Sequence, residues 1–180
     1  WIFAHNGDLH NFQPHLSGRF TPVGSTDSEL AFCYLLEQLV LKFGYFEPSL
    51  NDIFSLLEEI SPKIAEYGTF NFCLSNGQAL FSYATTKLHW IVREYPFQYA
   101  RLVDIDVDID FSKFTTEEDR VAVITTEPLT QNEIWTAYQP GEMILFRDGK
   151  VIKTATTTVD RLVREAKDPS LVRVTKADQY

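Results

Sequence analysis

Residues 1–12 read WIFAHNGDLHNF, and residues 22–36 read PVGSTDSELAFCYLL. The first five residues are apolar and aromatic, as in a short β-strand, and the following Asn-Gly is a strong turn signal that ends it. The second stretch predicts the start of a helix, because Thr26 and Glu29 have the spacing of a capping box. Behind them, apolar residues recur at the three- and four-residue intervals of an amphipathic helix.

Outward from these two stretches, the pattern predicts one more long helix and then a series of strands. The first helix is expected to end at Gly44, and a second follows Pro48. Ser61-Pro62 predicts that a separate turn or short helix begins there, since proline is favoured in the first turn of a helix. Expected strands are 69–75, 78–84, 88–94, 100–103, 120–126, 143–146 and 151–154, and a last helix is expected at 158–167.

The order of these elements indicates the fold class. One strand and two helices precede many strands that are joined by short turns, among them the hairpin signal Asn76-Gly77. This order predicts an α+β fold in which helices cover antiparallel sheets. A sandwich of two sheets with helices outside would bury so many half-apolar strands.

Composition excludes several classes of function. The 180 residues carry a net charge of −9, and the basic residues are scattered. Nucleic acids and anionic membrane surfaces require a concentrated Lys/Arg face, so neither is expected as a partner. There is also no apolar run near the roughly 20 residues that a membrane helix needs.

The two cysteines, Cys33 and Cys73, lie in the apolar contexts FCYLL and FNFCL. Two cysteines do not make a disulfide framework, and free cysteines are commonly small buried hydrophobes. We therefore expect reduced, structural thiols and a cytoplasmic location. Neither has the polar, electropositive surroundings that favour a thiolate nucleophile.

Two further patterns resemble metal sites without matching them. The segment 104–110, DIDVDID, begins like an EF-hand loop, but Ile109 and Thr115 stand where the loop needs Gly and Glu. Its alternation favours a strand with one acidic face. His5, His10 and His15 recur at intervals of five, which suits neither a helix nor a strand. No metal and no cofactor are expected.

Taken together, several motifs resemble the class II glutamine amidotransferases of the YafJ type. The motifs are FAHNGDLHNF and FTPVGSTDSELAFCYLL, followed in order by FNFCLSNG, TKLHWIVR, VITTEPLTQNEIW and PGE. The resemblance implies the fold of the N-terminal-nucleophile hydrolases, a four-layer αββα sandwich of two antiparallel sheets. These 180 residues are expected to form part of that sandwich. The same resemblance implies that residues 1–154 form the C-terminal part of a glutaminase domain. Residues 155–180 lie outside the resemblance, and their polar composition predicts a tail that carries the helix expected at 158–167.

The resemblance also implies roles for three residues. Amide cleavage passes through a tetrahedral intermediate whose oxygen becomes negative, and fixed N–H donors stabilise it. In the family these donors are an Asn side chain and a Gly backbone N–H, which correspond to Asn6 and Gly7. A carboxylate at the position of Asp27 binds the α-ammonium group of glutamine. Glutamine, or another γ-glutamyl compound, is therefore the expected ligand.

The family nucleophile is an N-terminal cysteine whose own amine acts as the base. This sequence begins with Trp1, so we expect that the nucleophile and the substrate-binding arginine lie in an upstream segment. Neither Arg19 nor Arg93 matches a family motif. By themselves the 180 residues are expected to be inactive. Two alternatives stay open: a hydrolase of another γ-glutamyl compound or amide without ammonia transfer, and a non-catalytic glutamine-binding relative. The oligomeric state is not predicted.

Overall fold

The computed structural model describes residues 1–104, 108–113 and 115–172. The largest sheet has the order β1-β2-β3-β9-β10, with bounds Ile2–Asn6, Asn71–Ser75, Leu80–Ala84, Glu142–Arg147 and Lys150–Thr156. A second sheet has the order β7-β4-β8, with bounds Arg120–Thr125, His89–Glu94 and Thr136–Ala137. A small sheet pairs β5 (Tyr99–Arg101) with β6 (Asp108–Asp110). The helices are α1 (Asp27–Phe43), α2 (Leu50–Ala65) and α3 (Asp160–Lys167), with 3-10 turns at Phe111–Lys113 and Pro169–Leu171.

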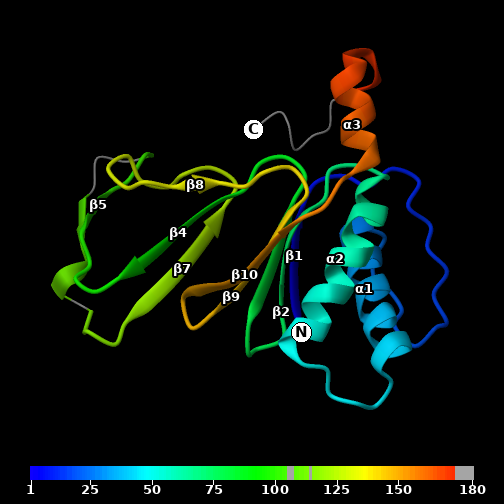
Figure 1. The fold of residues 1–180 in the computed structure, drawn as a ribbon, viewed down its shortest axis with the longest axis horizontal. Helices are drawn as coiled ribbons and strands as arrows, with labels where there is room; N and C mark the ends of the chain where they lie inside the picture. The colour runs from blue at the N-terminus through cyan, green and yellow to red at the C-terminus, as the bar shows by residue number, and fades with distance from the viewer. Residues whose placement is uncertain (105–107, 114, 173–180) are drawn as a thin grey trace.

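These elements form three layers (Figure 1). Helices α1 and α2 cover one face of the five-stranded sheet, where Phe72, Phe81 and Tyr83 are fully buried against them. The alternate residues of the same strands point to the other face and pack against the second sheet, as in the edge-to-face contact of Trp90 with Phe146. Every strand pairing within these sheets is antiparallel, and the helices form a layer of their own and do not alternate with the strands. The predicted α+β class is therefore confirmed.

The start of α1 agrees with the prediction only in part. Thr26 is the N-cap, and its hydroxyl accepts a hydrogen bond from the Glu29 N–H at 3.2 Å. The capping box is wrong in its second half, because the Glu29 carboxylate does not return to the N-cap. It accepts instead from the backbone N–H groups of Val23 and Gly24, both at 2.7 Å. Glu29 therefore ties the preceding loop to the helix.

The separate helix predicted at Ser61-Pro62 is also wrong, since α2 continues through both residues to Ala65. Proline inside a helix removes one backbone hydrogen bond and costs about 3 kcal/mol. Here Pro62 stands in the last turn, and continuing the helix buries Ile64 and Ala65 almost completely. Burial of the apolar stripe outweighs the local cost of the proline.

The remaining predictions hold, with shifts of at most two residues at the element ends. The Asn76-Gly77 turn joins β2 to β3 as expected, and the helix predicted at 158–167 is α3. Strand β8 has only two residues and was not expected. Within the acidic segment 104–110, residues 108–110 form β6, whereas 105–107 lie outside the described residues.

Across the described ranges, no helix has both the length and the apolar character that spanning a bilayer requires.

Candidate active site

Asn6 is the last residue of β1, and its side chain lies on the face of the sheet away from the helices. Its Nδ2 donates a hydrogen bond of 2.9 Å to Oγ1 of Thr126, which directly follows β7. The carbonyl oxygen of Thr126 in turn accepts from Nδ1 of His89 at 2.8 Å. An amide nitrogen carries two N–H groups, so the bond to Thr126 orients the Asn6 side chain and uses one of them.

Gly7 lies in close backbone contact with the segment that leads into β2. A Cβ at this position would come within 2.0 Å of the carbonyl oxygen of Thr69, which is backbone and has little freedom to move. Gly68 shows the reciprocal contact, because a Cβ there would lie 1.9 Å from the carbonyl oxygen of Asp8. Both positions therefore require glycine for the two backbone segments to approach.

Asp27 is the first residue of α1 and lies near the same end of β1. Its Oδ2 accepts a hydrogen bond of 2.7 Å from the backbone N–H of Leu9, two residues beyond Gly7. A carboxylate here is also favoured by the positive end of the helix dipole. The two sequence motifs thus meet at a direct contact between residues that are 18 positions apart.

His5 joins the same two segments and was not predicted as a site residue. Its Nδ1 lies 2.9 Å from Oγ of Ser28, and its Nε2 lies 3.1 Å from the carbonyl oxygen of Thr69. Burial lowers the pKa of the His5 imidazole, against opposing effects of Thr69, Asp27 and Asp8. The available signal was its alternation with Phe3, which places a polar ring on the face of β1 that packs toward the helices.

The structure thus brings the three predicted residues to one end of β1 from different directions. The side chain of Asn6 points toward the second sheet, and the carboxylate of Asp27 approaches from the helix layer. Thr126, His89 and His5 complete the surroundings as residues that the sequence interpretation had not assigned to the site.

Neither cysteine is suited to nucleophilic chemistry. Both are free; Cys33 is buried in α1, and burial raises the pKa of the Cys73 thiol to about 11. Both therefore stay protonated near neutral pH. Within the described part of the chain, no group of three or more His, Cys, Asp and Glu side chains gathers in a way that could hold a metal ion.

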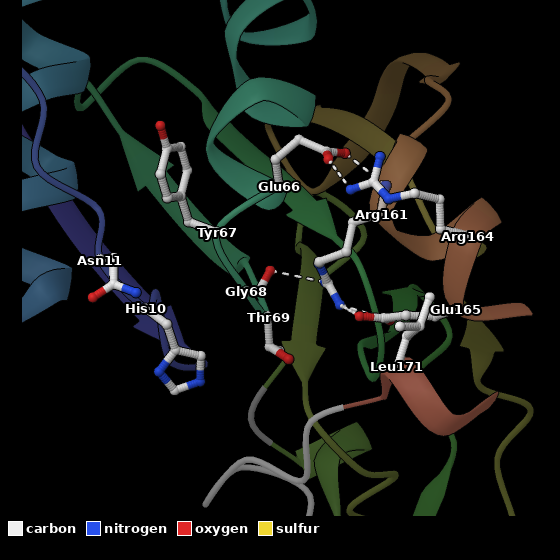
Figure 2. Close-up of a pocket in the computed structure, with 10 residues that line it drawn as sticks. All are labelled: His10, Asn11, Glu66, Tyr67, Gly68, Thr69, Arg161, Arg164, Glu165 and Leu171. Carbon is white, nitrogen blue, oxygen red and sulfur yellow. Dashed lines mark hydrogen bonds and ion pairs between the residues drawn. The ribbon is translucent and has the colours of Figure 1, made fainter. Parts of the chain in front are cut away.

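A cavity of about 420 Å³ lies beside this end of the sheet (Figure 2). Gly68 and Thr69 line it, together with Glu66 from the end of α2 and Arg161 from α3. Arg161 donates to the carbonyl oxygens of Ala65 and Gly68 at 2.8 and 2.9 Å and forms an ion pair with Glu165. These bonds fasten α3 to the segment that Gly7 contacts.

Comparison with known proteins identifies the family. Residues 1–170 match the sequence model of the family described as "Glutamine amidotransferases class-II". The chain is 44% identical over 153 residues to "Putative glutamine amidotransferase" of Haemophilus influenzae, which covers 84% of this chain and 51% of the relative. It is 44% identical over 146 residues to "Putative glutamine amidotransferase YafJ" of Escherichia coli, covering 81% of this chain and 57% of that protein.

A solved structure agrees. The 2.0 Å crystal structure of a "predicted glutamine amidotransferase" from Pseudomonas aeruginosa superposes with a TM-score of 0.74 at 43% identity, over 84% of this chain and 59% of that chain. The chain therefore spans about half the length of the curated relatives that it matches. The family match, the two relatives and the shared fold together show that this chain belongs to the class II glutamine amidotransferases.

Proposed function

We propose that this chain supplies the oxyanion donors and the ammonium-binding carboxylate of a site that releases ammonia from glutamine. In this proposal, the Asn6 side chain and the Gly7 backbone N–H bind the developing oxyanion, and Asp27 binds the α-ammonium group. One observation carries it: the Asp27 carboxylate accepts the Leu9 N–H at 2.7 Å, which joins the segment after Asn6 and Gly7 to the start of α1.

The nucleophile is proposed to be an N-terminal cysteine supplied by sequence other than these 180 residues, with reaction through a thioester. The high pKa of Cys73 and the burial of Cys33 support this assignment. So does the length of the relatives, which are about twice as long as the matched region. The two unpaired thiols also support a cytoplasmic location.

We further propose that the complete protein has the four-layer sandwich, with residues 1–154 as part of the glutaminase domain and 155–180 as its terminal segment. Three of the layers are the α1–α2 pair and the two main sheets. A fourth would cover the outer face of the β7-β4-β8 sheet. Apolar side chains on that face favour such a cover, among them Ile91 and Val123, which are register partners, and Val121, which is 46% exposed.

The proposal is tested by kinetics of glutamine hydrolysis in the full-length protein. Asn6→Ala is expected to lower kcat by about 10²–10³-fold, as when one oxyanion donor is removed. Thr126→Val is the matched control, because it removes the same hydrogen bond and keeps the amide. Its loss should be much smaller.

Asp27→Asn is the complementary variant, because it retains an acceptor for the Leu9 N–H and removes the charge. It is expected to raise KM for glutamine more than it lowers kcat. Equal turnover in Asn6→Ala and in the unaltered protein would reject the assignment. Hydrolysis of another γ-glutamyl amide in preference to glutamine would support the hydrolase without ammonia transfer, and binding of glutamine with no turnover would indicate a non-catalytic relative.

A further inference from the structure

His5 is a polar ring on a face of β1 that is otherwise apolar. It packs beside Phe70, with ring centroids 5.2 Å apart, and beside Phe3 at 6.3 Å. Both of its nitrogens nevertheless have polar partners, Ser28 and Thr69. A side chain that served only to fill space here would need neither partner.

The identity of the partners determines the direction of each hydrogen bond. The Thr69 carbonyl oxygen can only accept, so Nε2 of His5 carries the hydrogen and donates it. In the neutral ring Nδ1 is then an acceptor, and the Ser28 hydroxyl donates to it. Burial, which lowers the pKa of the ring, favours this neutral form at pH 7.

Each partner belongs to a different half of the proposed site. The carbonyl oxygen of Thr69 is the atom against which the Gly7 backbone packs. Ser28 directly follows Asp27 in the first turn of α1. His5 itself precedes Asn6. One imidazole therefore links the strand that carries the donors to the helix that carries the carboxylate.

We propose that His5 is a positioning residue that holds the Asn6 and Gly7 donors in register with the Asp27 carboxylate through its bonds to Thr69 and Ser28. This inference rests on the proposed function. No proton or group is transferred to the ring. Its effect arises because a displacement of about 1 Å at a reacting centre can cost on the order of 100-fold in rate.

The main test is His5→Phe in the full-length protein, which keeps an aromatic ring between Phe3 and Phe70 and removes both hydrogen bonds. We expect kcat for glutamine, normalised to sites titrated with an electrophilic glutamine analogue, to fall about 10- to 100-fold. The matched control is His15→Phe, in an exposed loop position, which should leave kcat and KM unchanged.

A purely structural role is separated by a double-mutant cycle. If His5 acts by placing the Asn6 donor, His5→Phe should lower kcat far less in the Asn6→Ala background than in the unaltered protein. Full multiplication of the two effects, or an unchanged kcat per titrated site in His5→Phe alone, would overturn the inference.

Ser28→Ala gives a second test at the helix surface, should His5→Phe fail to fold. It removes one of the two bonds, and the loss of a neutral hydrogen bond is expected to raise KM by about 2- to 10-fold. Unchanged kinetics would overturn the inference. Failure of the proposed function is distinguishable from failure of this inference. If the proposed function is wrong, the Asn6→Ala variant will have the same turnover as the unaltered protein, and the role of His5 is then rejected as well.

Discussion

Gly7→Ala is a sharp perturbation of the proposed oxyanion hole, because it adds one methyl group at a defined contact. The new Cβ would lie 2.0 Å from the carbonyl oxygen of Thr69, 2.7 Å from its carbonyl carbon and 2.9 Å from Nε2 of His5. Cβ contacts shorter than 3.0 Å essentially never occur, so the strand end must move by at least about 1 Å relative to Thr69. A displacement of that size corresponds to a loss of about 100-fold in kcat.

The same clash should lower the free energy of unfolding by about 1–3 kcal/mol, the usual cost of overpacking. The assays are kcat for glutamine and urea unfolding of the full-length protein. Gly77→Ala is the control, because Gly77 has positive φ (85°) and no atom within 4 Å of its Cβ position, so backbone strain is tested without a clash. Should Gly7→Ala retain normal turnover, and stability equal to that of the Gly77→Ala control, the close approach would not constrain the site.

Three further outcomes follow from the contacts and pKa shifts. Arg161→Ala, which removes the bonds to Ala65, Gly68 and Glu165, should lower the free energy of unfolding by about 1.5–3 kcal/mol and speed proteolysis within 159–172; an unchanged urea midpoint would contradict this. Cys73, with a pKa of about 11, should be alkylated at pH 8 on the order of 100-fold more slowly than an exposed cysteine in peptide mass spectrometry, and equal rates would contradict the raised pKa. Because the pKa of His5 is lowered in the fold, the unfolded chain binds more protons as the pH falls through about 6.5, so stability is lost on acidification. The stability advantage of the unaltered protein over His5→Phe should shrink between pH 7.5 and 5 in urea titrations, and a constant difference would contradict it.

Local sequence signals were sufficient to predict most of the helices and strands of the fold. Thr26 and Gly44 cap the two ends of α1, and Asn76-Gly77 forms the hairpin turn between β2 and β3. Both were predictable because caps and turns depend on a few neighbouring residues. Pro62 misled the prediction, since the burial of Ile64 is decided by tertiary packing that no local pattern records.

The candidate site was predictable only where it coincided with a family motif. Asn6, Gly7 and Asp27 were identified in that way. His5, Ser28 and Thr126 are in polar contacts that span 23 and 120 positions of sequence, and only folding brings such partners together. The alternating position of His5 on β1 was the single local sign of its role.

The most direct measurement is a crystal structure of the full-length protein with glutamate, the product of hydrolysis, in the site. We predict one oxygen of the side-chain carboxylate within about 2.7–3.1 Å of both Asn6 Nδ2 and Gly7 N, with the α-ammonium group paired with the Asp27 carboxylate. Glutamate bound elsewhere, with no contact to Asn6 or Asp27, would contradict the assignment of this end of β1 as the site of amide cleavage.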